Sequence, residues 1–267
     1  MNVCVFSVFH KNYWMSDDKL YIPIQVGFGD KILNPNTQKY ILRDNSGDNI
    51  ANKNKSYCEL TALYWVWKNI DFSKYDYIGL DHYRRHFCKK GLKEKKKRIL
   101  TDDYIQNILQ SKKTDIVLPK KRHYFIETNY SQYVHAHHEI DLKVTRDAIK
   151  TIYPDYLRSF DKIMNKRSGH RFNMFIMRTE VLEKYCEWLF SILTYVELNL
   201  DISSYSEYDT RVFGFIAERL LDVWLDNNAY KQIDMNYFFD GKVNWFKKIS
   251  NFIVRKISCR KGLYHYA

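Results

Sequence analysis

Residues 77–87 read YIGLDHYRRHF, and this stretch determines how the whole chain is interpreted. The run Tyr75–Leu80 is short and mainly apolar, as expected of a buried strand. It leads directly into an acid, two histidines and two arginines within six positions. Residues 3–9 (VCVFSVF) and Asp115–Leu118 predict two more buried strands. Side chains capable of binding or chemistry therefore follow a strand of the predicted core.

Helical patterns separate these strands. Apolar residues spaced i, i+3, i+4 and i+7 predict a helix over residues 57–70, begun by a capping box of Ser56 and Glu59. The other elements expected are a helix over most of 128–153, a strand at Phe172–Met177, a helix from Thr179 to about 198 and another from Asp209 to about 226. Strands that alternate with helices predict an α/β domain whose sheet is covered on both faces.

The positive charge of the chain is concentrated in two segments. The 267 residues have a formal net charge of +12. Residues 89–100 hold seven basic residues and one acid, and residues 241–267 hold seven basic residues and no acid. The body is therefore close to neutral, which argues against a nucleic-acid binder. We expect one domain over residues 1–240 and a basic tail over 241–267.

Within the tail, apolar residues recur at helical spacing between the basic ones: Trp245, Phe246, Ile249, Phe252, Ile253 and Ile257. This pattern predicts a basic amphipathic helix that lies on an anionic membrane surface. A helix packed on its own domain is the alternative. No apolar run reaches the ~18 residues of a membrane-spanning helix, and we expect no signal peptide. Five scattered cysteines without a CxxC pair indicate a reducing cytosol.

The cluster that follows Tyr75–Leu80 predicts a site for an anionic, phosphorylated ligand. Ligands of open α/β sheets bind beyond the carboxyl ends of the strands. Arg84 and Arg85 could hold phosphate oxygens, and Asp81 with His82 could hold a divalent metal, Mn or Mg. The alternative is an ion-paired turn in which Asp81 neutralises one of the arginines. The chain has neither a P-loop nor a GxGxxG motif, so side chains or a metal must meet the phosphates.

Three more groups of residues are candidates for a site. His10 and Lys11 follow the first predicted strand. Tyr133, His137 and Asp141 would share one face of a helix, as a tuned base, a sugar contact, a metal site or a polar helix surface. The last group lies in or just before the final predicted helix and comprises Glu207, Asp209, Arg211 and Glu218. For Glu218, an ion pair with Arg211 or Arg219 is the default expectation and a catalytic role is the alternative.

Several stretches together resemble a known family. They are HKNY (10–13), YIPIQVG (21–27), DNSGDNI (44–50), KNKSYCELTALYWVWKN (53–69), YIGLDHYRRHF (77–87), YVHAHHEIDL (133–142), FNMFIMRTEVLEKYCEWLFSIL (172–193) and RVFGFIAERLLDVWL (211–225). In this order they resemble the DUF4422-type bacterial glycosyltransferases of capsule, exopolysaccharide and lipopolysaccharide assembly. The resemblance covers roughly residues 1–240 and leaves out the basic tail.

The resemblance implies a GT-A-like (Rossmann-like) domain with a mixed sheet and transfer of a sugar from a nucleotide-sugar. It implies a UDP-sugar donor, with galactose in pyranose or furanose form as a candidate sugar. The acceptor would be a growing glycan, lipid-linked at the inner face of the cell membrane, where the enzyme would be cytoplasmic and peripheral. A non-catalytic glycan- or nucleotide-binding module of a polysaccharide assembly complex is the alternative.

The resemblance also carries roles onto individual residues. The donor and its diphosphate would be bound by His10, Asp48, Asn49, Asn54, His82, Tyr83, Arg84 and Arg85. Lys11 and Asp81 join this set because they follow predicted strands, and not through the resemblance. Glu59 matches the same N-terminal motifs. The acceptor and the transferred sugar would be bound by Tyr133, Asp141, Asn173, Met174 and Arg211. The catalytic candidates are Asp209, Glu218 and His137, with Glu207 as a further candidate for the base.

Overall fold

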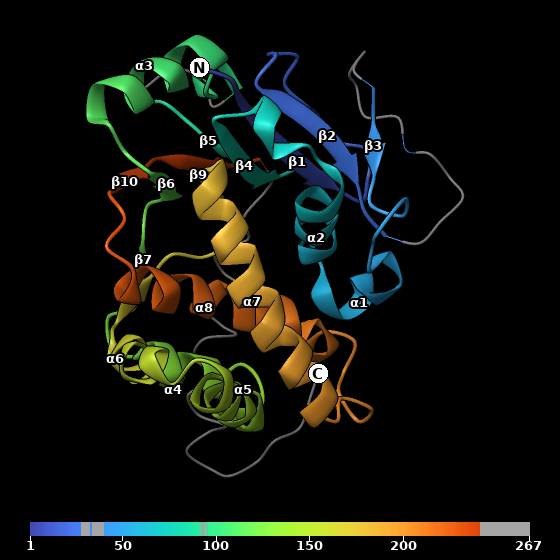
Figure 1. Cartoon of the computed structure of the whole chain (residues 1–267), viewed down its shortest axis with the longest axis vertical. Coiled ribbons are helices and arrows are strands. Elements are labelled where there is room, and N and C mark those ends of the chain that lie inside the picture. The colour runs from blue at the N-terminus through green and yellow to red at the C-terminus, as the bar shows by residue number, and fades with distance from the viewer. Residues whose placement is uncertain (28–32, 34–39, 92–93, 95, 241–267) are drawn as a thin grey trace.

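The computed structural model describes residues 1–27, 33, 40–91, 94 and 96–240 (Figure 1). A mixed sheet lies at its centre, with the order β10-β6-β9-β4-β1-β2-β3 and with β5 and β11 attached beside β4. Its strands are β1 (Val3–Phe9), β2 (Tyr21–Gln25), β3 (Leu42–Arg43), β4 (Tyr77–His82), β5 (Arg85–Phe87), β6 (Ile116–Pro119), β9 (Phe175–Arg178), β10 (Gln232–Met235) and β11 (Tyr237–Phe239). A separate ribbon pairs β7 (Arg122–His123) with β8 (Ser168–Gly169).

The central strands run parallel, and β9 is the exception. β1 pairs in parallel with both β2 and β4, and β6 pairs in parallel with β10. β9 runs antiparallel between β4 and β6. Because β1 and β4 are parallel neighbours, their carboxyl ends meet at the same edge of the sheet.

Helices cover both faces of this sheet, as predicted. The helices are α1 (Asn54–Tyr57), α2 (Leu60–Asn69), α3 (Asp102–Lys112), α4 (Asn129–Val134), α5 (Glu139–Ile152), α6 (Leu157–Asn165), α7 (Thr179–Asn199) and α8 (Val212–Asn227). Short 3-10 turns lie at Ala51–Lys53, Phe72–Lys74, Lys96–Arg98, Pro154–Tyr156 and Asp209–Arg211. α2, α7 and α8 lie on one side of the sheet, and α4, α5 and α6 form an outer layer beyond them (Figure 1).

The alternation of side chains along β1 explains why both faces need a cover. Cys4, Phe6 and Val8 join the core beneath α2, α7 and α8. Val3 and Val5 join the core on the opposite face, which α3 closes. Successive side chains of a strand point to opposite faces of the sheet. A strand that is apolar on both faces must therefore be covered on both faces.

The structure extends the second predicted strand by two residues. β4 ends at His82, not at Leu80. Because side chains alternate, Asp81 points to the face that α3 covers, and His82 points to the opposite face. Asp81 and His82 therefore belong to the strand instead of following it, and their side chains lie on opposite faces of the sheet.

Two predicted helices are broken. Cys58 has a φ of 53°, in the left-handed region, which ends α1 and separates it from α2. Ser56 lies inside α1, and Glu59 precedes α2 without a side-chain cap, so the expected capping box does not form. The second predicted helix is interrupted after Val134, and His138 precedes α5.

Other expected boundaries shift by a few residues. β9 begins at Phe175 because Phe172 and Asn173 have positive φ angles of 81° and 49°, which a strand does not accommodate. Thr179 is the first residue of α7 rather than its cap. Asp209 starts a 3-10 turn, and α8 proper begins at Val212.

The expectations about membrane spans and cysteines can be compared with the structure only over its described residues. Among the described residues, no helix combines the length and apolarity needed to cross a bilayer. The basic tail, residues 241–267, lies outside the described residues. The four cysteines of the described part, Cys4, Cys58, Cys88 and Cys186, are free thiols.

We predict that Gly79→Ala lowers the stability of the fold by about 1–3 kcal/mol through overpacking in β4. A Cβ at this position would lie 2.8 Å from Ile176 Cγ1, 2.9 Å from the Phe175 carbonyl oxygen and 2.9 Å from Val5 Cγ2. Urea unfolding of both proteins gives the difference.

Gly214→Ala in α8 is the matched control. Its Cβ would make ordinary contacts of 3.5 Å with Cys58, and alanine is favoured over glycine inside a helix by about 0.5–1 kcal/mol. Equal midpoints for Gly79→Ala and the unsubstituted protein would contradict the packing described for β4.

Candidate functional site

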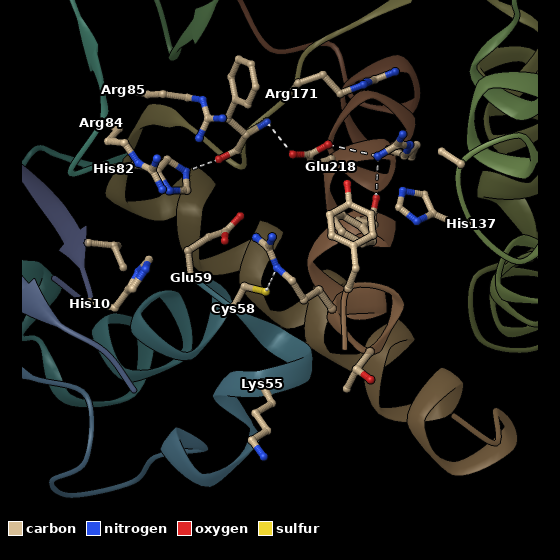
Figure 2. A pocket seen from close by; sticks show the side chains of 18 of the residues that line it. His10, Lys55, Cys58, Glu59, His82, Arg84, Arg85, His137, Arg171 and Glu218 are labelled. Atoms are coloured by element: carbon tan, nitrogen blue, oxygen red, sulfur yellow. Dashed lines mark hydrogen bonds and ion pairs between the residues drawn. The ribbon is translucent and has the colours of Figure 1, made fainter. Parts of the chain in front are cut away.

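A cavity of about 1110 Å³ opens at the ends of β1 and β4, beside the first turns of α8 (Figure 2). Its described walls carry seven basic side chains, namely Lys55, Arg84, Arg85, Arg122, Arg171, Arg211 and Arg219. They carry three acidic ones, namely Glu59, Glu207 and Glu218. Histidines and aromatic rings complete much of the wall: His10, His82, His137, Tyr83, Tyr124, Phe172, Tyr205, Tyr208, Phe215 and Phe239. This excess of cations favours an anionic ligand.

Arg84, in the turn after β4, and Arg85, the first residue of β5, point into the cavity (Figure 2). Arg84 donates a hydrogen bond to the hydroxyl of Tyr83, and the Arg85 guanidinium lies 4.3 Å from the ring centre of Phe172. In the described part of the chain, neither has a carboxylate within ion-pair distance. Burial lowers the pKa of Arg85, and the cavity glutamates partly oppose that shift. Both arginines therefore keep N–H groups for phosphate oxygens.

Asp81 does not reach the cavity. Its carboxylate is fully buried and accepts hydrogen bonds from the Ser7 hydroxyl at 2.6 Å and from Nδ1 of His86 at 2.9 Å. The alternative in which Asp81 neutralises Arg84 or Arg85 is therefore not what the structure contains. Both carboxylate oxygens are engaged on the face of the sheet that lies away from the cavity.

The pair predicted to hold a metal does not fit one. His82 lines the cavity, where its ring contacts the carbonyl oxygen of Phe172, whereas Asp81 lies on the opposite face of the sheet. Within the described ranges, no group of three or more His, Cys, Asp or Glu side chains is placed to hold a metal ion.

The two site residues predicted after β1, His10 and Lys11, differ in their position relative to the cavity. His10 lines the cavity, and its ring meets that of Tyr83 edge-on with 4.9 Å between centroids. Desolvation, followed by the positive charges of Lys11, Arg84 and Arg211, lowers the pKa of His10. A neutral imidazole can accept a hydrogen bond from a ligand. Lys11 is exposed and is not part of the described cavity wall.

The loop between β8 and β9 brings a second set of groups to the cavity. His170 is buried, with Nδ1 2.6 Å from Asp222 Oδ1 and Nε2 3.1 Å from Asp234 Oδ1. This double contact fixes the next residue, Arg171, whose Nε donates to the Tyr124 hydroxyl at 3.1 Å. The loop conformation therefore depends on one histidine held between two carboxylates.

Two glutamates point into the cavity (Figure 2). Glu218 accepts hydrogen bonds from the Phe172 amide at 3.1 Å and from Arg219 Nη1 at 3.0 Å, which confirms the ion pair expected for it. Oε1 of Glu59 accepts a hydrogen bond from Asn173 Nδ2 at 2.7 Å. Among the described contacts, the second carboxylate oxygen of Glu59 has no hydrogen bond. That oxygen is available to a ligand.

Four residues predicted to bind the acceptor lie behind the described cavity wall: Tyr133, Asp141, Asn173 and Met174. The Tyr133 hydroxyl donates to Asp141 at 2.8 Å, and this buried pair joins α4 to α5 across the helix break. Asn173 orients a cavity glutamate, and Met174 packs in the core beneath α3. Arg211 is the member of this predicted set that lines the cavity, with Nε 3.2 Å from Cys58 Sγ.

The predicted catalytic residues occupy two layers. His137 and Glu218 line the cavity, and His137 stacks on Phe215 with 4.2 Å between ring centroids. Asp209 is buried behind His137, with Oδ1 3.2 Å from Nδ1 of the histidine. Asp209 therefore orients His137 and does not face the cavity, whereas its neighbour Glu207 does.

Of the other predicted donor-binding residues near the N-terminus, some line the cavity and others do not. Asp48 and Asn49 lie outside the described cavity wall, where Asp48 accepts a hydrogen bond from the Tyr64 hydroxyl of α2 and Asn49 accepts one from the Ala51 amide. Asn54 lines the cavity and donates to the Cys58 carbonyl oxygen at 2.8 Å, which fixes the turn before α2.

Sequence reasoning missed several residues of the wall, among them Lys55, Cys58, Arg122, Tyr124 and Arg171. Arg171 directly precedes the FNMFIM segment, but an isolated Arg-Phe pair has no spacing that indicates a site. The three-dimensional path of the β8–β9 loop is what brings it to the cavity.

Comparison with known proteins identifies the architecture. The model of a family described as a domain of unknown function, DUF4422, matches residues 4–229. The solved apo structure of the WbbM bifunctional glycosyltransferase is similar over 91% of this chain, with 29% identity and a TM-score of 0.80. The match covers 46% of WbbM, so the chain spans less than half of that protein. The fold is GT-A-like, as the sequence resemblance implied.

More distant solved structures are also similar. Core-mannan synthase A (CmsA/Ktr4) of Aspergillus fumigatus, in an Mn/GDP form, shares 11% identity over 91% of this chain and 81% of that chain, with a TM-score of 0.36. The mannosyltransferase Ktr4p of S. cerevisiae shares 14% identity over 81% of this chain and 61% of that chain, with a TM-score of 0.30. A search of curated proteins found no match.

We predict that the His170 contact makes stability depend on pH. Burial alone lowers the pKa of His170, but the hydrogen bonds and charges of Asp222 and Asp234 outweigh it and raise the pKa above the usual 6.5. The stabilisation should be complete below pH 6.5 and decline as the pH rises through the higher pKa of the folded protein. Urea unfolding at a series of pH values measures it.

His170→Gln should lower the unfolding midpoint most at acidic pH and flatten this decline. The exposed His123→Gln is the control and should keep the profile of the unsubstituted protein. Identical pH profiles for all three proteins would show that His170 is not a protonated partner of the two aspartates.

Proposed function

The chain belongs to the DUF4422 family, and we propose that it is a glycosyltransferase that transfers a hexose from a UDP-sugar to a bacterial surface glycan. Galactose, as pyranose or furanose, is the sugar we propose. The similarity to WbbM, a bifunctional glycosyltransferase, supports transfer chemistry. The observation that carries the proposal is the pair of arginines, without carboxylate partners in the described part, at the end of β4.

These arginines suit a leaving diphosphate. During transfer, the bond between the sugar C1 and the diphosphate oxygen breaks, and negative charge develops on the nucleotide. Arg84 and Arg85 can donate several N–H groups to that charge without first breaking an internal ion pair. A preorganised cation costs little reorganisation at the moment of reaction, which is the basis of electrostatic catalysis.

The walls of the cavity divide into two regions. His10, Asn54 and His82 lie with the arginines at the ends of β1 and β4 and around α1, where we place the donor nucleotide. Ligands of open α/β sheets bind at this edge. His137 and Glu207 come from the helical half, where we place the acceptor. The transferred sugar would lie between the two regions.

A carboxylate must take the proton of the acceptor hydroxyl if the anomeric configuration inverts. We assign this step to Glu59, because Asn173 holds one carboxylate oxygen and leaves the other facing the cavity. As the acceptor oxygen bonds to C1, the proton of the acceptor hydroxyl passes to the cavity-facing carboxylate oxygen of Glu59. Glu218 is instead held on both oxygens by the Phe172 amide and Arg219, which suits a positioning role.

We propose a lipid-linked glycan as the acceptor, which places the enzyme on the cytoplasmic face of the cell membrane as a peripheral protein. The neutral body and the basic tail of the sequence support this location. If donor binding requires Mn or Mg, manganese should increase the stabilisation that the donor gives in a thermal-shift assay.

We predict that Arg84→Ala with Arg85→Ala abolishes sugar transfer and leaves the fold intact. Each lost charge-assisted contact to the diphosphate should cost about 1.5–3 kcal/mol. UDP release from UDP-sugars in the presence of a glycan acceptor measures transfer, and circular dichroism measures folding. Arg146→Ala, which removes an exposed partner of Asp161 on α6, is the control and should keep full activity. Full activity of the double variant would refute the assignment.

A thermal-shift series tests the donor class. UDP, GDP and several UDP-sugars should be compared with and without manganese. A ligand that binds the native state raises the melting temperature according to RT ln(1 + [L]/Kd). We expect UDP and one UDP-sugar to raise it and GDP not to do so. Stabilisation by no nucleotide would contradict a nucleotide-sugar enzyme.

We predict that Glu59→Gln lowers kcat by about 10²–10⁴-fold while the Kd for the donor stays within about threefold. The amide keeps the shape of the side chain and can still contact Asn173, but it cannot accept a proton. Glu218→Gln is the comparison and should reduce thermal stability as well as activity, because it weakens the pair with Arg219. Equal kcat values for Glu59→Gln and the unsubstituted enzyme would exclude Glu59 as the base.

A further inference from the structure

The tip of the loop between β7 and α4 exposes two adjacent apolar side chains. Phe125 is 93% exposed and Ile126 is 57% exposed. Other large apolar side chains that are exposed in the described part of the chain are not adjacent to one another in sequence. Single exposed apolar residues are common, but a consecutive pair at a loop tip indicates a contact surface.

Basic residues lie before and beside this tip, and the acid that follows it, Glu127, contacts His135 Nδ1 at 2.7 Å. Lys120, Lys121, Arg122 and His123 directly precede the tip, and all four are exposed. Arg167 lies beside it, because its carbonyl oxygen accepts a hydrogen bond from the Tyr124 amide at 2.7 Å. Within the described ranges, none of these arginines and lysines forms an ion pair with a carboxylate. The tip therefore combines apolar side chains with cations available to an anionic partner.

The loop is held at both ends. Before the tip, β7 pairs with β8 through Arg122–Gly169 and His123–Ser168. After it, Thr128 begins α4 with a capping box that it shares with Ser131. A tip anchored on both sides presents Phe125 and Ile126 with little loss of conformational entropy on binding.

The same loop forms part of the cavity wall. Arg122 and Tyr124 line the cavity, and the Tyr124 hydroxyl accepts a hydrogen bond from Arg171. Phe125 follows Tyr124 directly in the chain. The exposed apolar tip therefore lies at the rim of the cavity and not on a remote face.

We propose that residues 120–126 are a membrane-binding rim of the cavity. Phe125 and Ile126 enter the boundary between headgroups and acyl chains of an anionic bilayer, and the basic residues bind its lipid phosphates. A duplex nucleic acid bound through its phosphates would use the cations and leave the apolar tip without a partner. The purpose that we give to this rim, which is to bring a lipid-linked acceptor to the cavity, rests on the proposed function. The membrane contact itself does not.

Vesicle sedimentation of the full chain tests the rim. We expect binding to vesicles of phosphatidylcholine mixed with phosphatidylglycerol and weak binding to phosphatidylcholine alone. Phe125→Ser with Ile126→Ser should reduce binding to the anionic vesicles by about tenfold or more. Lys120→Gln with Lys121→Gln should also reduce it by about tenfold or more, with a weaker salt dependence. Leu198→Ser, at an apolar residue of α7 that is 80% exposed, should bind as the unsubstituted protein does.

Three outcomes would overturn the proposal. The first is unchanged vesicle binding of the Ser double variant, which would assign any membrane contact to another part of the chain. The second is a change of that variant from dimer to monomer with unchanged vesicle binding, which would make the tip an interface between two copies. The third is an equal loss for Leu198→Ser. Donor binding in the thermal-shift series is independent of the rim, so failure of the proposed function would leave the vesicle result interpretable.

Discussion

The alternation of side chains along β4 is the constraint on which the site depends. β4 is buried on both faces, so Asp81 and His82 point to opposite sides of the sheet. The Asp81 charge is compensated in the interior by Ser7 and His86 and is thereby withdrawn from the cavity. Among the described residues, no carboxylate lies within ion-pair distance of the two arginines that follow, although Glu59 and Glu218 share the cavity wall with them. One buried carboxylate on the far face thus leaves the near face cationic.

A cavity with more cations than anions tends to destabilise the empty protein, because like charges repel and lose solvation. The fold limits this cost with contacts that do not neutralise charge. Arg84 and Arg85 lie against aromatic rings, and Arg219 donates to the carbonyl oxygen of Phe215. Binding a diphosphate would supply the missing negative charge. The electrostatic strain of the empty cavity and its affinity for an anion therefore have the same origin.

Positioning residues form a layer behind the cavity wall. His170 is clamped between two aspartates and sets the β8–β9 loop, Asn173 orients Glu59, and Asp209 orients His137. Asn173 and Asp209 were predicted to touch the ligand, since charged and amide side chains in motif segments resemble binding groups. In sequence, a residue that binds and a residue that positions its neighbour have the same chemistry. Only their place in the cavity wall or behind it distinguishes them, since buried residues such as Arg171 and Arg219 also line the cavity.

The sequence by itself determined the α/β class, the sheet covered on both faces, the family, and the arginine cluster after the second core strand. These follow from local patterns, because apolar periodicity and strand ends depend on neighbours in the chain. Only the tertiary structure decided that Asp81 faces away, that Glu59 and Arg171 reach the cavity, and that Phe125 lies at its rim. Each of these depends on contacts between segments far apart in sequence, such as Asn173 with Glu59 and Arg171 with Tyr124. No local pattern encodes such contacts, because they arise only when the loops fold against one another.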